Sequence, residues 1–276
     1  MAVALSAYCL RWRRARAWAL PMDRAALDIL TRNIPAYKHM AVDLQAQLQR
    51  LVTQFLYQKK IIGCAGLDVT EEMRITIAGL ACLLLLNRPT KVYPALHTIL
   101  LYPHAFVVDT DEIGPGGVVS SMENNLLGES WDDGRVILAW DHVQIGAPDW
   151  VDGQNVVLHE FAHQLDSESG ESNGAPFLGS FSSYRSWATV LSRNFAKLQY
   201  DAIHQHHSVL DYYGATSPAE FFAVATETFF EKSQQMSEHH PDLFEELAKY
   251  YKVDPRAWLS PPVALAQHRT TPVSHS

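Results

Sequence analysis

The segment HEFAH at residues 159–163 constrains the fold more than any other feature of this 276-residue chain. Four residues of α-helix turn by about 400°, so His159 and His163 leave one face of a helix with their Cβ atoms roughly 5–6 Å apart. This spacing lets both imidazoles reach one zinc ion. The neighbouring apolar residues supply a face that can be buried. We therefore expect a helix over about 152–165, capped by Asp152, that carries a metal site.

Glu160 lies on the flank of the face that His159 and His163 form. It is too far round the helix to join them as a ligand, but its carboxylate can address a water molecule on the metal. Zinc lowers the pKa of such a water towards neutrality, and a carboxylate can take its proton and pass it to a leaving amine. The motif thus predicts a catalytic zinc site with Glu160 as the general base.

A catalytic zinc ion requires three protein ligands and one open position. The extended pattern H-E-x-x-H-x-x-G-x-x-H does not apply, because this chain has Asp166 and Ser169 where that pattern has glycine and histidine. Further along, Ser217 and Pro218 predict the start of a helix, and Glu220 falls in its first turn among apolar residues. A buried carboxylate without a partner is costly, so Glu220 is the expected third ligand; a carboxylate at the helix start that faces solvent is the alternative.

Three further side chains are candidates for supporting roles. Glu227 lies two turns beyond Glu220 on the same helix face and could hydrogen-bond a ligand histidine, with a solvated or structural role as an equal alternative. Asp166 lies one turn beyond His163 and could either orient an imidazole or face solvent. Tyr213, just before the helix, could donate its hydroxyl to a developing oxyanion.

The rest of the chain predicts one α+β domain, mostly helical, in the order helices, small sheet, helices. Residues 22–87 have a helical pattern, in which Thr70 caps an apolar helix that ends at Asn87. Two β-branched and aromatic runs, 98–108 and 134–143, predict strands of the small sheet beside the metal-site helix. Further helices are expected over 181–200, 217–235 and 241–251.

The two ends differ from the domain predicted over 24–258. Residues 1–23 form a basic leader whose arginines follow its apolar part, which argues against a secretory signal. A poorly ordered leader is expected, and a membrane-surface anchor is the alternative. Residues 259–276 predict a flexible tail. The longest apolar run, 75–86, is too short to span a bilayer and predicts a buried helix.

Charge and cysteine content limit the partners and the compartment. The formal net charge of −8 argues against nucleic acid or an anionic membrane as a direct partner, whereas a protein partner stays open. Three scattered cysteines are too few for a disulfide framework and suit a reducing compartment. We therefore expect a cytoplasmic protein without a transmembrane segment.

The segment HEFAH, followed downstream by YGATSPAEFFA, resembles the zinc peptidase family of Mlc titration factor A. The catalytic core of that family is similar to the lethal-factor-type protease domain. Segments at 34–40, 67–85 and 128–143 extend the resemblance over about residues 24–255. The resemblance implies a zincin-like fold with one zinc ion. It also implies that the ligands are His159, His163 and Glu220, that Glu160 is the general base, and that Tyr213 stabilises the transition state.

Three functional hypotheses follow. The leading one is a zinc metallopeptidase that acts on peptide or protein substrates; aminopeptidase action is one candidate, and the family implies a transcription repressor as a further partner. The alternative is a non-catalytic protein that sequesters a repressor on the same scaffold, although the intact Glu160 favours catalysis. The third is a closed structural zinc site with His142 or Asp166 as a fourth ligand.

The strand segment 135–140 precedes the metal-site helix. In zinc peptidases of the type that this chain resembles, the strand before the motif helix often offers its edge to the substrate, so the resemblance implies β-augmentation by an extended peptide. The alternative is an interior strand without substrate contact.

Overall fold

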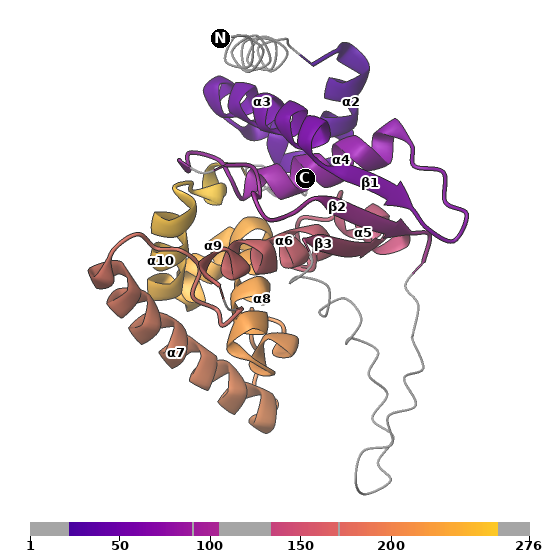
Figure 1. Cartoon of the computed structure of the whole chain (residues 1–276). Coiled ribbons are helices and arrows are strands. Elements are labelled where there is room, and N and C mark those ends of the chain that lie inside the picture. Colours follow the sequence, from indigo (N-terminus) through magenta and orange to yellow (C-terminus); the bar gives the residue numbers. More distant parts are fainter. Residues whose placement is uncertain (1–21, 90, 105–133, 171, 259–276) are drawn as a thin grey trace, which may run out of the picture.

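The computed structural model describes residues 22–89, 91–104, 134–170 and 172–258, which form a mostly helical structure around a small sheet (Figure 1). The predicted α+β class is therefore confirmed. The predicted leader and tail lie outside the described residues, apart from Met22 and Asp23. In the described part of the chain, no helix is both long and apolar enough to cross a membrane.

The first part of the chain runs to the gap at 105–133. Its elements are α2 (Arg24–Asn33), η1 (Pro35–His39), α3 (Val42–Gln58), β1 (Lys60–Gly63), α4 (Glu71–Leu83) and β2 (Thr98–Tyr102). The predicted cap of α4 is confirmed, because the Thr70 hydroxyl accepts a hydrogen bond from the Met73 amide at 3.3 Å. The apolar run 75–86 is buried throughout, as predicted, but the helix ends at Leu83 instead of Asn87, and residues 84–87 form a turn.

The second part begins after the gap. Its elements are β3 (Arg135–Ala139), α5 (Trp140–Gly146), α6 (Val156–Asp166), η3 (Ser167–Ser169), α7 (Phe181–His204), η4 (Tyr212–Ala215), α8 (Pro218–Glu231), α9 (Ser233–His239), α10 (Pro241–Tyr251) and η5 (Pro255–Trp258). The helices predicted at 181–200 and 241–251 are confirmed. The helix predicted over 217–235 is two helices, because the backbone of Lys232 leaves the helical region between α8 and α9.

The sheet has the strand order β1-β2-β3, and both strand pairs are parallel. Ile61 pairs with Ile99, which in turn pairs with Val136, and all three are buried. The all-helical prediction for residues 22–87 was wrong at β1. A segment of four residues is too short for its periodicity to reveal a strand, and β1 is fixed by its pairing with the distant β2. Of the strand predicted over 98–108, residues 98–102 form β2, and residues from 105 on lie outside the described part.

The prediction of a strand over 134–143 is too long. The observed strand β3 ends at Ala139, and α5 follows directly. Ala139 pairs with Tyr102, which is the last residue of β2. Beyond this point β2 therefore offers no partner for further strand pairing. Asp141 then lies in the first turn of α5, where its carboxylate accepts a hydrogen bond from the His142 amide at 2.8 Å. An acidic residue favours the start of a helix, and the apolar pattern did not reveal this change.

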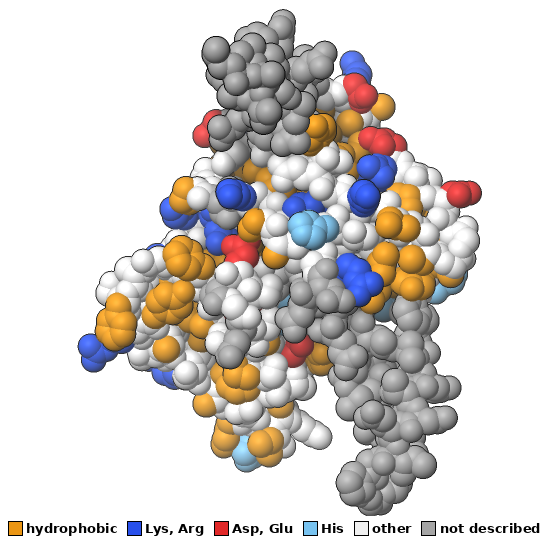
Figure 2. All heavy atoms as spheres, viewed as in Figure 1, with side chains coloured by type: hydrophobic (Ala, Val, Ile, Leu, Met, Phe, Trp, Pro, Cys, Tyr) orange, Lys and Arg blue, Asp and Glu red, His pale blue; other side chains and the backbone are white. Residues whose placement is uncertain are grey.

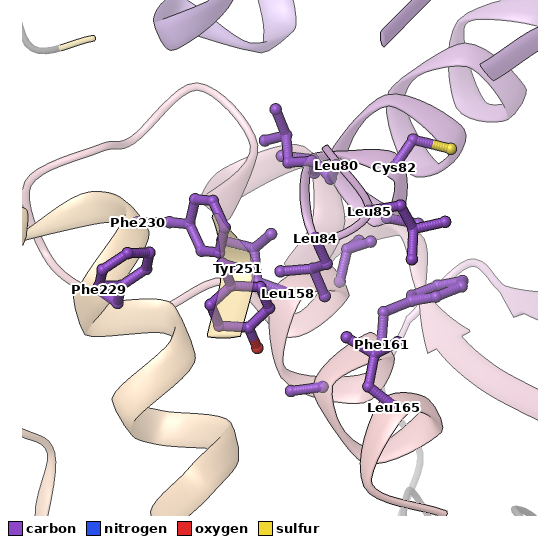
Figure 3. Close-up of a cluster of buried hydrophobic side chains, with 14 of the residues drawn as sticks. Leu80, Cys82, Leu84, Leu85, Leu158, Phe161, Leu165, Phe229, Phe230 and Tyr251 are labelled. Carbon is purple, nitrogen blue, oxygen red and sulfur yellow. The ribbon is translucent and has the colours of Figure 1, made fainter. Parts of the chain in front are cut away.

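The buried face of α6 holds this helix in the core. Figure 3 shows Leu158, Phe161 and Leu165 of α6 within a cluster of apolar side chains from α4 and the turn after it, from α8 and from α10. The other labelled members of the cluster are Leu80, Cys82, Leu84, Leu85, Phe229, Phe230 and Tyr251. Each fully buried large apolar side chain contributes about 1.5–3 kcal/mol. The apolar face of α6 is thereby anchored, which fixes the direction of the polar face that carries His159.

Candidate metal centre

Helix α6 begins after Asn155, so the cap predicted at Asp152 is corrected. The Asn155 side chain accepts a hydrogen bond from the Leu158 amide at 3.2 Å. The Asp152 carboxylate instead accepts from the Gln154 amide at 2.9 Å, within the turn that precedes the helix. Gly153 between them has a φ of 74°, which a right-handed helix does not allow. Both residues are of types that cap helices, and the sequence alone did not distinguish them.

Three predicted ligands converge in the structure. The Nε2 atoms of His159 and His163 lie 3.2 Å apart, and Glu220 Oε2 lies 3.0 Å from the former and 3.4 Å from the latter. Two ligand atoms of a tetrahedral zinc site lie about 3.3 Å apart when each bond is about 2.0 Å long. The arrangement of these three atoms therefore fits a metal ion of that size.

The sequence of α8 explains why Glu220 reaches α6. Pro218 is the first residue of the helix, and the Ser217 hydroxyl accepts a hydrogen bond from the Glu220 amide at 3.2 Å. Phe221 and Phe222 are buried beside it and fix the rotation of α8 against the core. The Glu220 side chain keeps 18% of its exposure, and it points at the histidines instead of into the apolar core.

Protonation at this centre differs from one ligand to the next. Burial raises the pKa of the Glu220 carboxyl, but the hydrogen bonds from His159 and His163 outweigh that effect and lower the pKa to about 2. Burial lowers the pKa of His163 to about 4. Burial also lowers the pKa of His159, but Glu227 and Glu220 outweigh it and hold that pKa well above its usual value. One carboxylate and one neutral imidazole are therefore already in the state that a metal ion requires.

Glu227 lies behind His159. Its Oε1 atom is 2.7 Å from His159 Nδ1, and its Oε2 atom accepts a hydrogen bond from the Asn155 amide at 2.5 Å. Glu227 is buried on α8. Because Nδ1 donates to Glu227, the Nε2 atom of His159 is directed at Glu220 and His163. Pairs of this kind fix the tautomer and the ring orientation of histidines that bind metals.

A second contact behind the site was missed by the sequence analysis. The side-chain amide of Asn155 donates to Glu231 Oε1 at 2.9 Å, whereas its backbone N–H donates to Glu227. The residue that caps α6 is therefore hydrogen-bonded to two carboxyl groups of α8. Burial raises the pKa of Glu231 to about 9. The signal that could have revealed this contact is the spacing of Glu227 and Glu231, which lie one turn apart on an otherwise apolar helix.

Glu160 and Tyr213 line the same cavity as the three converging residues. This cavity has a volume of about 400 Å³. Glu160 is 2% exposed, and the ring of Tyr213 lies 6.0 Å from that of His159, centroid to centroid. The short helix η4 positions Tyr213, whose amide donates to the Asp211 carboxylate at 2.8 Å. The structure therefore gathers all five residues of the predicted catalytic set around one cavity.

Asp166 is placed apart from this cavity. It is buried, and its Oδ2 atom accepts a hydrogen bond from the Gly174 amide at 2.7 Å. Burial raises its pKa to about 6, against the effect of the backbone amides that it contacts. His142 lines the cavity but does not join the three converging ligands. Across the described ranges no fourth His, Cys, Asp or Glu joins them, which leaves a coordination position open.

Comparisons with known proteins identify the family of this chain. The family model described as glucose-regulated metallo-peptidase M90 matches residues 9–252, so the match begins within the segment predicted as a leader. An uncharacterized protein of Synechocystis is 40% identical over 247 residues, which cover 89% of this chain and 90% of that protein. Mlc titration factor A of Enterobacter is 31% identical over 239 residues, covering 86% and 87%. Mlc titration factor A of Klebsiella pneumoniae (strain 342) is 32% identical over 225 residues, covering 80% and 84%. By the extent of these matches, the chain belongs to the glucose-regulated metallo-peptidase M90 family.

Proposed function

We propose that the protein is a zinc-dependent peptidase with one catalytic zinc ion held by His159, His163 and Glu220. The observation that carries this proposal is the convergence of these three ligand atoms in the wall of a cavity that Glu160 and Tyr213 also line. Membership in a family of metallo-peptidases supports it. The open coordination position favours a catalytic site over a closed structural one.

The side chains around the cavity have separate roles in this proposal. When bound, zinc supplies the activation of a water molecule and the polarisation of a peptide carbonyl. Glu160 takes a proton from that water on its carboxylate and delivers it to the leaving amine. The Tyr213 hydroxyl donates a hydrogen bond to the carbonyl oxygen as that oxygen gains negative charge. Burial raises the pKa of Tyr213 to about 12, so the hydroxyl keeps its proton at neutral pH.

Two acidic residues support the ligands. Glu227 accepts a hydrogen bond from Nδ1–H of His159 and thereby keeps Nε2 directed at the metal. Asp166 acts at a greater distance. It is the last residue of α6, three residues after His163, and its carboxylate accepts a hydrogen bond from the Gly174 amide. We assign both of them positioning roles.

The substrate is proposed to be an extended peptide that pairs with β3. This strand has β2 on one side, and α5, which follows it directly, contributes His142 and Ile145 to the cavity wall. A zincin-like arrangement over residues 24–258, with the peptide beside the metal helix, is the fold that we propose for this activity.

A protein partner is the second candidate function. Several relatives that match most of this chain bear the name Mlc titration factor A, which says that those proteins titrate Mlc. We propose that this chain also binds a transcription repressor. Cys64 and Cys82 are free thiols, which suits a cytoplasmic site of action for both roles.

The decisive experiment compares wild type with Glu160→Gln by metal analysis and a peptide-library digest. The variant is expected to keep one equivalent of zinc and to lose about 10²–10⁴-fold in turnover, because it lacks the proton acceptor. Glu245→Gln, which changes an exposed carboxylate on α10, is the matched control and should retain full activity. Undiminished hydrolysis by Glu160→Gln would instead assign the activity to a contaminating protease and favour the non-catalytic binding function.

A further inference from the structure

Two carboxyl groups lie buried together behind the candidate metal centre. Glu227 and Glu231 are one turn apart on α8 and are 6% and 2% exposed. The Asp and Glu side chains visible in Figure 2 lie at the surface instead, where water solvates their charge. Two carboxylates buried one turn apart would repel each other without that solvation. We therefore expect one of the two to carry a proton.

Hydrogen bonds distinguish the two carboxyls. Glu227 accepts from the Nδ1–H of His159 at 2.7 Å and from the backbone N–H of Asn155 at 2.5 Å. Glu231 accepts only from the Asn155 side chain, at 2.9 Å, and its Oε2 atom has no hydrogen-bond partner among the described residues. Donors favour the charged form of a carboxyl, and a buried oxygen without a partner costs more when it is charged. The charge therefore belongs to Glu227 and the proton to Glu231.

The charges that face Glu231 also favour its neutral form. Burial raises the pKa of Glu231 to about 9, against the hydrogen bond from Asn155. Three nearby carboxylates add to this rise: Glu227, Asp152 and Asp149. Each of them makes a further negative charge at Glu231 less favourable.

Positive charge is available to only one of the two carboxyls. Burial also raises the pKa of Glu227, but the charge and the hydrogen bond of His159 oppose that rise. Lys232 follows Glu231 in the chain, yet its side chain lies along Gly153, where a Cβ atom would be 3.2 Å from the ammonium nitrogen. Across the described ranges, no Lys, Arg or His forms an ion pair with Glu231. A charge on Glu231 would therefore be uncompensated.

Asn155 connects Glu231 to the metal centre, because its backbone N–H holds the carboxylate behind His159. The Asn155 side chain is fixed by three hydrogen bonds. Its Oδ1 atom accepts from the Leu158 amide at 3.2 Å, and its Nδ2 atom donates to the Gly146 carbonyl at 3.4 Å and to Glu231 at 2.9 Å. The bond to Glu231 is the shortest of the three and ties this side chain to α8. Its loss would loosen Asn155 and the direction of its backbone N–H.

We propose that Glu231 is a positioning residue for the proposed zinc ligand His159. As a neutral carboxyl it holds Asn155, and Asn155 in turn orients the carboxylate of Glu227 behind that histidine. Glu231 does not line the cavity of the metal centre, so it acts through these neighbours and not on a substrate. This role rests on the proposed zinc site.

Two variants separate the hydrogen bond from the charge. Glu231→Gln is neutral at every pH and still presents an acceptor to Asn155, whereas Glu231→Met is of similar size and presents none. Competition with a chelator measures the zinc Kd of the full-length proteins at neutral pH. We expect Glu231→Gln to bind zinc within about twofold of wild type. Glu231→Met should bind it about tenfold more weakly, as is typical when a residue that orients a metal ligand is lost.

Glu246→Met is the matched control. Glu246 is another buried carboxyl, on α10, and accepts hydrogen bonds from Ser186 and Lys249. Its replacement should lower stability and leave the zinc Kd unchanged. A wild-type Kd in Glu231→Met would overturn the proposal. So would a tenfold loss of affinity in Glu231→Gln, which decides the matter even where Glu231→Met does not fold.

Infrared spectroscopy tests the neutral state directly. The difference spectrum of zinc-loaded wild type and Glu231→Gln at neutral pH should contain the carbonyl band of a neutral carboxyl. A carboxylate band in its place would refute the neutral form.

The pH dependence of stability gives a second readout of the same proton. A carboxyl whose pKa is raised by folding stabilises the folded protein at low pH, and this contribution is lost as the pH rises through the raised value. Wild type should therefore lose stability relative to Glu231→Gln between about pH 5 and 9, by up to about tenfold in the unfolding equilibrium constant per pH unit. Denaturant unfolding of both proteins measures this, and a difference that does not change with pH would contradict a proton on Glu231.

These measurements do not depend on turnover. Undiminished hydrolysis by Glu160→Gln would end the peptidase proposal, whereas the zinc Kd and the infrared band would still decide the role of Glu231. The two proposals can therefore fail separately.

Discussion

The two histidines proposed as zinc ligands differ in protonation although they lie one turn apart on α6. Burial dominates at His163 and keeps its imidazole neutral, with a pKa of about 4. His159 has a carboxylate at each ring nitrogen, Glu227 at Nδ1 and Glu220 at Nε2. These charges outweigh burial and raise its pKa well above the usual value. Without metal, the proton on His159 therefore supplies the positive charge that the surrounding carboxylates require.

The role proposed for Tyr213 is to donate a hydrogen bond to the carbonyl oxygen as negative charge develops there in the transition state. Tyr213→Phe is expected to lower kcat by about 10²–10³-fold with little change in zinc content, because one donor to the developing oxyanion is lost. Steady-state kinetics on a peptide that wild type cleaves checks this. The control is Tyr212→Phe, which removes the hydroxyl of the adjacent, partly exposed tyrosine that bonds the His206 carbonyl. Comparable kcat values for the two variants would argue against an oxyanion role for Tyr213.

At the scale of elements, the helices that carry the ligands could be predicted from the sequence. The spacing of the H-E-x-x-H motif and its apolar neighbours indicated α6, and the pair Ser217 and Pro218 indicated the start of α8. Both signals are local, since capping and periodicity depend on residues within a few turns. The convergence of Glu220 on the two histidines follows from the packing of these two helices.

Contacts between distant segments could not be predicted in the same way. β1 forms only because β2 pairs with it, and α5 begins where β2 ends. The bonds of Asn155 to Glu227 and Glu231 depend on how the end of a loop meets α8. No local sequence pattern specifies these tertiary hydrogen bonds, because Asn155 alone resembles an ordinary helix cap and each glutamate alone resembles a solvated carboxylate.

The loop between α6 and α7 gives a prediction at this scale. Gly174 has a φ of 77°, and a Cβ atom there would lie 2.4 Å from the Pro218 carbonyl oxygen at the start of α8. Gly174→Ala is therefore expected to lower the free energy of unfolding by about 1–3 kcal/mol from backbone strain, and further from the clash. It should also weaken zinc binding, because Pro218 lies two residues before Glu220. Denaturant unfolding and zinc titration measure the two effects.

Gly179→Ala is the matched control. Gly179 has a φ of 78°, but a Cβ atom there would meet nothing within 4 Å. This variant carries the same backbone strain without the clash, so it should lose less stability and keep its zinc affinity. Equal losses in the two variants would show that the contact with Pro218 does not position α8.

At the scale of the whole molecule, the candidate metal centre connects two parts of the chain. In Figure 1, α6 lies near the sheet, and α8 belongs to the C-terminal group of helices, α7 to α10. Their packing already joins these parts, and a metal ion held by the candidate ligands of both helices would add a second connection. A metal ion bound only by the folded protein stabilises it by about 2.7 kcal/mol at a free concentration one hundred times its Kd. Addition of zinc should therefore raise Tm, and chelation should lower it.

The pH dependence of zinc binding follows from the same three ligands. Glu220, with a pKa of about 2, and His163, with a pKa of about 4, are already deprotonated at neutral pH, whereas the raised pKa of His159 means that it must lose a proton from Nε2. Zinc binding should therefore release about one proton, and its affinity should rise about tenfold per pH unit below the pKa of His159. Calorimetry in buffers of different ionisation enthalpy measures this number. Glu227→Gln removes the charge that raises the pKa of His159, so this variant should release fewer protons near neutral pH and bind zinc about 10–100-fold more weakly. Release of two protons at a pH well below that at which a zinc-bound water ionises would mean that His163 is also charged, contrary to its burial.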